Sequence, residues 1–207
     1  MKYQDFVIKN GVLIGKFEEM YQTFSDPWEQ SKREKFALEK KIALQLIKEN
    51  QHKSPLEIGC GHGHFTNELC KIAGNASGID ISKTAIQTAK NLYPNCNFYD
   101  SNISDIDTIK LINPDCIMLV EITWYVLDHL DSFKKEIYKH FSKKNIGFFH
   151  SLMTYKPGEQ QYGKDFFTCG EEINEYFSDI IEILDFGEIG KKEYGGGKRT
   201  FFYGKIK

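Results

Sequence analysis

A glycine-rich turn between an apolar run and a helical stretch is the first feature of this sequence that could bind a ligand. Pro55–Ile58 has the apolar character of a buried strand, and Gly59, Gly61 and Gly63 follow it directly. Glycines in such a turn let the backbone approach a ligand without side-chain collision, although a close strand-to-helix connection would need them too. A dinucleotide-binding turn has its third glycine where this chain has His64, so the spacing disfavours a pyrophosphate ligand.

Two carboxylates accompany the turn. Glu57, at the end of the strand, would repel a diphosphate but favours a cation. Asp80 closes the next apolar run, about 20 residues after the turn, where Rossmann-type sites hold a ribose-binding carboxylate. The alternative for Asp80 is an acid beside the predicted helix cap Ser82. The glycines and the two acids together indicate a cationic nucleoside that carries no phosphate.

Composition limits the class of protein. The 207 residues, 41% of them hydrophobic, suffice for one domain with a sizeable core. The formal net charge of -2 argues against a nucleic-acid partner. The chain starts without a signal-peptide pattern and has no apolar run long enough to cross a bilayer, so we expect a cytoplasmic protein without a membrane partner. No two cysteines form a C-x-x-C pair, so we expect free thiols and no metal site. The cysteines are Cys60, Cys70, Cys96, Cys116 and Cys169.

Short apolar runs that alternate with helical stretches predict a single α/β domain of the Rossmann-like, doubly wound type. We expect a mostly parallel seven-stranded sheet with an antiparallel C-terminal hairpin, because the Gly-rich residues 194–198 are too few for a crossover helix. Expected strands lie near 55–58, 76–80, 96–99, 115–120, 145–150, 181–187 and 200–206. Expected helices lie near 63–73, 83–92, 104–111, 131–141 and 170–178.

The first 50 residues are predicted to form a helical cap on a core that comprises residues 51–207. Asp26-Pro27-Trp28 suits a helix start, because Asp can cap free amides and Pro is favoured in the first turn. An amphipathic helix over 29–50 is expected to follow, with its lysines and glutamates on a solvated outer face.

The motif from Glu57 to Gly63 and the acid Asp80 resemble the class I S-adenosylmethionine-dependent methyltransferases, whose first motif is acid-x-Gly-x-Gly-x-Gly. The segment 95–103 is similar to the third-strand segment whose end meets the adenine ring. That family usually has Asp there, and the matching residue is Asn102 by spacing, with Asp100 as the competing alignment. The resemblance implies S-adenosylmethionine as cofactor and S-adenosylhomocysteine as product. The implied cofactor-binding residues are Glu57, Gly59, Cys60, Gly61, Gly63, Asp80, Ile81, Asn102, Ile103 and Glu121.

The segment 114–130 resembles the NodS-like branch of this class, in which an acid precedes an aromatic pair, here Trp124 and Tyr125. The fifth strand of that branch ends in a histidine, as 148–150 does here. NodS itself methylates the amine of a glycolipid, but the branch includes other acceptors. The resemblance therefore implies a methyltransferase without determining its substrate.

Several side chains are candidates for acceptor binding and catalysis. His150, at the end of a predicted strand, is the first choice for a general base or acceptor-orienting group, against the alternative of a structural histidine. His129, His62 and His64 are weaker candidates for the base. Glu121 could contact the methionine portion of the cofactor or an acceptor amine. The predicted substrate pocket comprises Tyr21, Trp28, Trp124, Tyr125 and His150, where the aromatic residues could instead serve core packing.

The predicted function is methyl transfer to an oxygen or nitrogen atom of a small soluble metabolite, such as a sugar, a nucleotide-sugar or a phosphorylated intermediate of glycan biosynthesis. One alternative is a non-catalytic, S-adenosylmethionine-binding regulatory subunit, which would keep the same fold. A nicotinamide-dependent oxidoreductase is the other alternative, and the residue His64 within the turn disfavours it. Neither the acceptor atom nor the oligomeric state is determined by these patterns.

Overall fold

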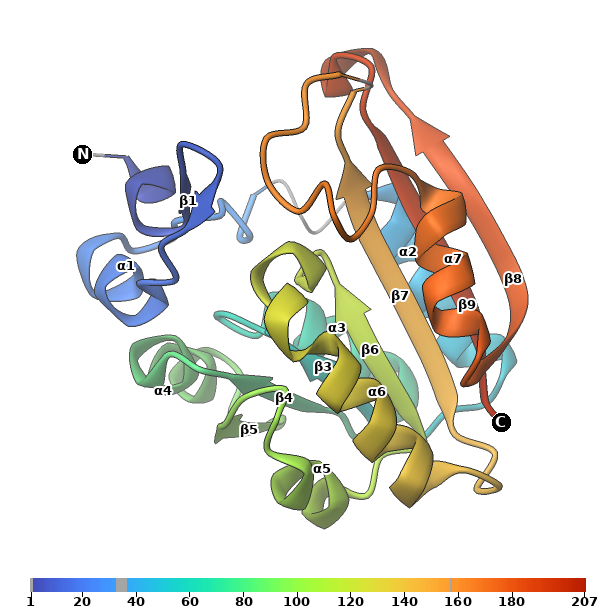
Figure 1. Cartoon of the computed structure of the whole chain (residues 1–207). Coiled ribbons are helices and arrows are strands. Elements are labelled where there is room, and N and C mark those ends of the chain that lie inside the picture. The colour runs from blue at the N-terminus through green and yellow to red at the C-terminus, as the bar shows by residue number, and fades with distance from the viewer. Residues whose placement is uncertain (1, 33–36, 157) are drawn as a thin grey trace.

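The computed structural model, which describes residues 2–32, 37–156 and 158–207, contains a seven-stranded sheet (Figure 1). The strand order is β5-β4-β3-β6-β7-β9-β8; β3 to β7 pair in parallel, whereas β9 runs antiparallel to β7 and β8. This arrangement confirms the predicted fold class, including the C-terminal hairpin. The strands are β3 (Pro55–Ile58), β4 (Ser77–Asp80), β5 (Asn97–Asp100), β6 (Cys116–Val120), β7 (Gly147–Thr154), β8 (Ile181–Gly190) and β9 (Lys198–Ile206).

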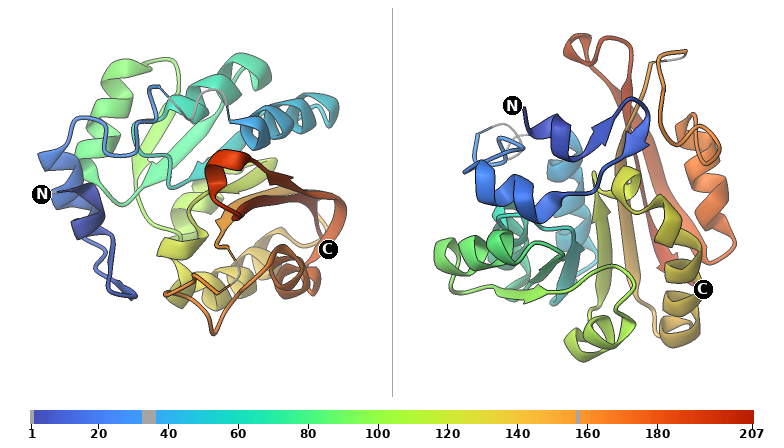
Figure 2. Two further views of the ribbon diagram at one scale, coloured as in Figure 1. Left: turned by 90° about the horizontal axis from the view of Figure 1, so that it is seen from above. Right: turned by 60° about the vertical axis from the view of Figure 1, so that its left-hand side comes forward.

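Helices cover both faces of this sheet (Figures 1 and 2). One face carries α2 (Leu38–Glu49), α3 (His64–Ala73) and α4 (Lys83–Leu92), and the opposite face carries α5 (Ile106–Ile112), α6 (Leu127–Phe141) and α7 (Gly170–Ser178). Short 3-10 helices η1 (Tyr3–Phe6), η3 (Thr123–Tyr125) and η4 (Lys192–Tyr194) lie in the connections. Across the described residues, no helix combines the length and apolar character needed to cross a membrane.

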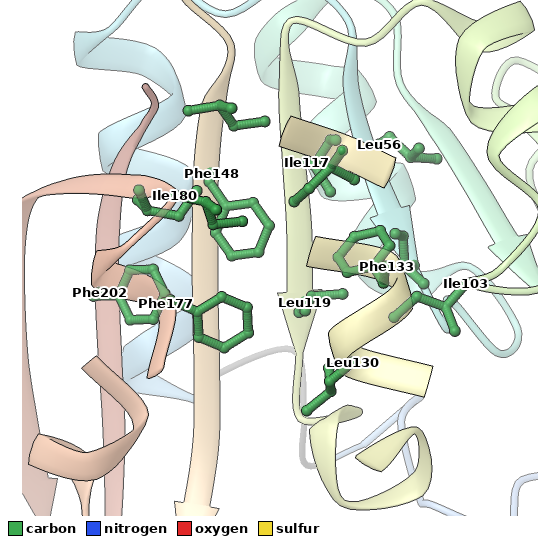
Figure 3. Packing of buried hydrophobic residues seen from close by; sticks show 14 of the residues in the cluster. Leu56, Ile103, Ile117, Leu119, Leu130, Phe133, Phe148, Phe177, Ile180 and Phe202 are labelled. Atoms are coloured by element: carbon green, nitrogen blue, oxygen red, sulfur yellow. The ribbon is translucent and has the colours of Figure 1, made fainter. Parts of the chain in front are cut away.

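The main hydrophobic core lies between the sheet and the layer formed by α5, α6 and α7 (Figure 3). Side chains of the central strand β6 alternate between the two faces, as the pleat of a strand requires. Ile117 and Leu119 belong to the main core together with Phe133 of α6, whereas Met118 belongs to a second cluster with residues of α2 and α3. Packing on both faces therefore holds β6 in place, and the residues that follow it are attached to a rigid base.

The predicted helix over 29–50 is wrong in its first part. Residues near Asp26 form turns, and α2 occupies only the C-terminal part of the predicted range. The Asp26 carboxylate accepts a hydrogen bond from the backbone N–H of Gln30 at 2.8 Å, which closes a local turn. Glu29 has a φ of +50°, a left-handed conformation that cannot continue a right-handed helix. Residues 33–36, which the prediction also included, lie outside the described residues.

The N-terminal segment is also less helical than the predicted cap over residues 1–50. It contains a two-stranded sheet of β1 (Ile8–Lys9) and β2 (Val12–Leu13) before helix α1 (Phe17–Thr23). Strands of two residues are too short for an alternating pattern to reveal them. Helix α2 packs in the cluster shared with α3, so it belongs to the core and not to a cap.

A partly buried hydrogen-bond network ties the N-terminal segment to the start of α4. Glu18 of α1 accepts hydrogen bonds from Ser82 Oγ and Thr84 Oγ1, both at 2.7 Å. Partial burial opposes ionisation, yet these hydrogen bonds lower the pKa of Glu18 to about 2. Ser82 also accepts a hydrogen bond from the backbone of Ala85 at 3.1 Å, which confirms the predicted cap of α4. The segment is thereby held across the end of the sheet where β4 terminates (Figure 2).

Leu119→Ala is expected to lower the free energy of unfolding by about 2–5 kcal/mol, because truncation of this fully buried side chain leaves a cavity in the main core. Leu111→Ala is the matched control, since Leu111 on α5 is 79% exposed and its truncation should change stability by less than about 0.5 kcal/mol. Urea unfolding followed by circular dichroism measures both. Similar losses in the two variants would contradict the placement of Leu119 in the core.

Candidate cofactor and acceptor site

A cavity of about 850 Å³ lies over the carboxyl ends of β3, β4, β6 and β7. The strand order reverses between β3 and β6, and ligands of open α/β sheets bind in the crevice at such a point. Most of the predicted site residues line this cavity: Tyr21, Trp28, Glu57, Gly59, Asp80, Ile81, Asn102, Ile103, Glu121, Trp124 and Tyr125. The predicted residues Cys60, Gly61, Gly63 and His150 are not among the described residues that line it.

The glycine turn forms one wall of the cavity through its backbone. Gly59 has a φ of +76°, and a Cβ atom there would lie 2.2 Å from Ile122 Cδ1, so only glycine fits. The backbone N–H of Gly61 donates a hydrogen bond to Asp80 Oδ2 at 2.9 Å. The side chain of Cys60 points behind the turn, into a cluster with Phe98 of β5. The Cys60 side chain therefore packs away from the cavity, which leaves the backbone of Cys60 for the predicted cofactor contact.

Asp80 lies in the cavity wall at the end of β4. Its second carboxylate oxygen, Oδ1, accepts a hydrogen bond from the backbone of Ser82 at 2.9 Å. Burial raises the pKa of Asp80 to about 6, against the opposing effect of its hydrogen bonds to Ser82 and Gly61. The next residue, Ile81, is 61% exposed and lines the same cavity. A carboxylate beside an exposed apolar surface suits a ribose with its attached base.

Glu57 is the most deeply buried acid of the cavity wall. Burial raises the pKa of Glu57 to about 7, although the Lys40 ammonium and a hydrogen bond from Thr66 Oγ1 lower it. A cationic ligand would favour the ionised carboxylate and so recover part of the cost of burying it. The raised pKa therefore marks Glu57 as a group suited to receive a positive charge.

The structure distinguishes the two alignments considered for the adenine contact. Asn102 lines the cavity, and its Oδ1 accepts a hydrogen bond from the backbone of Ser104 at 2.8 Å. Asp100 is exposed, lies 3.7 Å from the ammonium of Lys83, and is not among the described residues lining the cavity. Asn102 is therefore the better candidate for the adenine contact.

His150 does not lie in the cavity, so its prediction as general base and pocket residue does not agree with the structure. The residue is fully buried, and its ring stacks on Phe202 with centroids 5.2 Å apart. Its Nε2 forms a 2.7 Å hydrogen bond with Thr123 Oγ1. Burial lowers the pKa of His150 to about 3, so it stays neutral at physiological pH. Because β7 continues to Thr154, His150 lies within the strand and not at its end.

At the end of β6, Glu121 joins a charged network. Its backbone has a φ of +60°, and Oε2 accepts a hydrogen bond from the backbone of Met153 at 3.1 Å. Arg199 of β9 lies 3.7 Å from Glu121 Oε1 and 2.6 Å from Oε1 of Glu39, which is fully buried in α2. A left-handed backbone at a residue whose side chain is held by contacts from β7 and β9 is typical of a functional position.

Aromatic side chains surround the part of the cavity beyond Glu121. Trp124 donates a hydrogen bond to the carbonyl of Met153 at 2.8 Å and packs edge-on against Tyr155 at 5.4 Å between centroids. Tyr125 lies 5.6 Å from Trp28 of the N-terminal segment, centroid to centroid. Trp124 also belongs to the main core, so it serves both packing and the pocket wall.

The sequence analysis missed several residues of the cavity wall. Tyr155, Lys156 and Tyr194 come from the loop after β7 and from the hairpin tip, whose sequences contain no recognisable motif. Lys40 was assigned to a solvated helix face but is 6% exposed. Helical spacing could have revealed it, because Lys40 lies three residues before the buried Ala43 and shares its face.

Residues 49–152 match the family model described as a methyltransferase domain, and the chain belongs to this family. The family and the fold together define a class I S-adenosylmethionine-dependent methyltransferase, whose cofactor is S-adenosylmethionine. The predicted class is therefore confirmed. The glycine turn and the two buried acids lie within the matched region, whereas other parts of the cavity wall come from residues before and after it.

Solved structures include a similar fold over nearly the whole chain. The N-methyltransferase NodS from Bradyrhizobium japonicum, in complex with S-adenosyl-L-homocysteine, superposes with a TM-score of 0.71 at 15% identity, covering 96% of this chain and 99% of that one. This agrees with the resemblance to the NodS-like branch at the level of the fold.

Curated relatives match over part of their length and differ in what they act on. A phosphoethanolamine N-methyltransferase from Triticum aestivum is 28% identical over 58% of this chain and 27% of its own. A probable ribosomal RNA small subunit methyltransferase A from Pyrococcus furiosus is 27% identical over 62% of this chain and 48% of its own. The chain thus spans half or less of the length of these relatives.

His150→Leu is expected to leave the affinity for S-adenosylhomocysteine unchanged, as calorimetry would show. His150 by itself should lower the free energy of unfolding of the wild type by about 3 kcal/mol between pH 7 and pH 4, because in that range the unfolded histidine binds a proton that the buried one, with its pKa near 3, does not. The difference between wild type and variant isolates this contribution from those of Glu57 and Asp80, which have the opposite sign. The variant lacks this contribution, so its stability deficit at pH 7, caused by the unpaired Thr123 hydroxyl, should shrink or reverse at pH 4. A large loss of affinity would instead return His150 to the site.

Proposed function

We propose that this protein transfers the methyl group of S-adenosylmethionine to an oxygen or nitrogen atom of a small molecule. The observation that carries the proposal is that two buried carboxylates, Glu57 and Asp80, lie with the glycine turn in the wall of one cavity. S-adenosylmethionine would supply a methyl group on a positively charged sulfur, with an ammonium group and a ribose nearby in the same molecule. The cavity wall contains two acids, and its glycines lack the spacing of a dinucleotide-binding turn, so the wall suits these groups.

The residues divide between a cofactor end and an acceptor end because of the strand order. Glu57 lies in β3, Asp80 ends β4 and Asn102 follows β5, and these three strands form one half of the sheet. We assign Asp80 to the ribose hydroxyls, Asn102 and Ile103 to the adenine edge, and Ile81 to an apolar face of the base. Gln30 Oε1 is a buried oxygen with no hydrogen-bond partner among the described residues, and it lies over the glycine turn. It provides a further hydrogen-bond acceptor at the cofactor end.

The acceptor end lies beyond the end of β6, in the other half of the sheet. Its walls are Trp124, Tyr125, Tyr155 and Tyr194, which offer rigid contact surface and polar edges to a small molecule. Glu121 stands between the two ends, and we assign it to the methionine portion of the cofactor. These side chains would hold the acceptor atom in line with the sulfur–methyl bond, and much of the catalysis can come from that alignment.

The volume of the cavity and the charge of the chain favour a small acceptor over a nucleic acid. The formal net charge of the chain is -2, so its surface offers no excess of cations for a phosphate backbone. A cavity of about 850 Å³ exceeds the lower end of the range for a single ligand and leaves space for an acceptor beside the cofactor. Small sugars, nucleotide-sugars and phosphorylated metabolites remain the proposed acceptors.

Asp80→Asn is expected to weaken binding of S-adenosylhomocysteine by at least about tenfold, because the amide removes the charge that strengthens the hydrogen bonds to the ribose. Asp100→Asn is the matched control, since this carboxylate ends the neighbouring strand but lies outside the cavity wall. Isothermal titration calorimetry measures both affinities. Equal affinities for the two variants would contradict the assignment of Asp80.

Incubation of the protein with methyl-labelled S-adenosylmethionine and a cell extract is expected to label a small metabolite, detected by mass spectrometry. The Asp80→Asn protein serves as the negative control. Label recovered only in RNA would overturn the proposal of a small acceptor. Tight binding of S-adenosylhomocysteine with no labelled product in any fraction would favour a regulatory subunit that keeps the cofactor site.

A further inference from the structure

A buried lysine faces the cofactor end of the cavity. Lys40 of α2 lines the cavity and is 6% exposed, and its ammonium lies 5.2 Å from the centre of the Phe65 ring on α3. The charge of Lys40 is also the strongest influence that favours the ionised form of Glu57. The wall therefore presents an ammonium and a carboxylate to the same end of the cavity.

Lys40 is unusual among the lysines of α2 because helical spacing places it on the buried face. Lys40 shares the buried face of α2 with Ala43 and Ile47, whereas its neighbour Lys41 is exposed on another face. Burial of an ammonium costs free energy that an apolar side chain at the same position would avoid. A buried ammonium that lines the cavity favours an anionic group of a ligand.

The methionine end of S-adenosylmethionine is an amino-acid zwitterion, with an ammonium and a carboxylate on one carbon. Glu57 can bind only the ammonium, and a cation in the same part of the site would strengthen binding of the carboxylate. On the basis of the proposed function, we propose that Lys40 binds the α-carboxylate of the cofactor while Glu57 binds its α-ammonium. The two side chains then form a charge pair that is complementary to the zwitterion.

This arrangement also explains why the pair can exist in the ligand-free protein. Lys40 and Glu57 attract each other, which limits the cost of burying either charge before the cofactor arrives. Binding of the zwitterion adds one opposite charge to each of them. A purely structural ion pair, by contrast, would gain nothing from the amino-acid part of the ligand.

Ligands that lack one part of the zwitterion separate these roles. Calorimetry at pH 8 should compare S-adenosylhomocysteine with its decarboxylated analogue, which keeps the ammonium, and with 5′-methylthioadenosine, which lacks both groups. Lys40→Met is expected to weaken binding of S-adenosylhomocysteine by about 10- to 100-fold and to change the affinity for the other two ligands by less than about threefold. Lys41→Met, on the exposed face of the same helix, should leave all three affinities unchanged.

Glu57→Gln gives the complementary pattern. It should weaken both ligands that carry the ammonium and leave 5′-methylthioadenosine unaffected. Thermal unfolding of each variant establishes that it folds, and the affinity for 5′-methylthioadenosine provides the internal reference in the same sample.

The outcomes separate this inference from the function on which it rests. If the wild-type protein binds neither S-adenosylhomocysteine nor 5′-methylthioadenosine, the proposed function fails. If the wild-type protein binds both, but Lys40→Met weakens all three ligands equally or none of them, the role of Lys40 is overturned while the cofactor site stands. Lys40→Arg, which retains the charge, should recover part of the lost affinity for S-adenosylhomocysteine.

Discussion

The burial of two carboxylates at the ends of neighbouring parallel strands is the constraint on which this site depends. Asp80 is held by the backbone N–H groups of Gly61 and Ser82, so its position is coupled to the glycine turn and to the start of α4. Glu57 is coupled through Thr66 to the first turns of α3. The same hydrogen bonds that make these charges tolerable therefore also determine the shape of the cavity wall.

This arrangement has a cost for the ligand-free fold. Burial raises the pKa of Glu57 to about 7 and that of Asp80 to about 6, above the values of 4.5 and 3.8 for unperturbed groups. At pH values between the unperturbed and the raised pKa of each group, the folded chain binds more protons than the unfolded chain. The free energy of unfolding therefore falls as the pH rises through that range. Natural sites commonly retain such unfavourable groups where a ligand needs them, because binding stabilises the ionised form.

The acceptor end is built differently from the cofactor end. Its walls come from η3, the loop after β7 and the hairpin tip, together with the N-terminal segment that Glu18 ties to α4. Glu121 pairs with Arg199 of β9, which also contacts Glu39 in α2. Changes in loop sequence can therefore alter the acceptor surface without disturbing Asp80 or the glycine turn, which the sheet positions.

Local sequence alone determined the strands, most of the helices, the parallel sheet and the cofactor motif. Those features depend on residues close together in the chain: the alternation of apolar runs with helical periods, and the glycines beside Glu57. The tertiary structure decided which side chains face the cavity. His150 has the right residue type near a strand end, yet the longer strand β7 places it in the core, whereas Lys40 lies on a helix that only packing against α3 brings to Glu57. Contacts between elements depend on strand length, register and helix rotation together, and a one-residue difference in a strand moves a side chain to the opposite face.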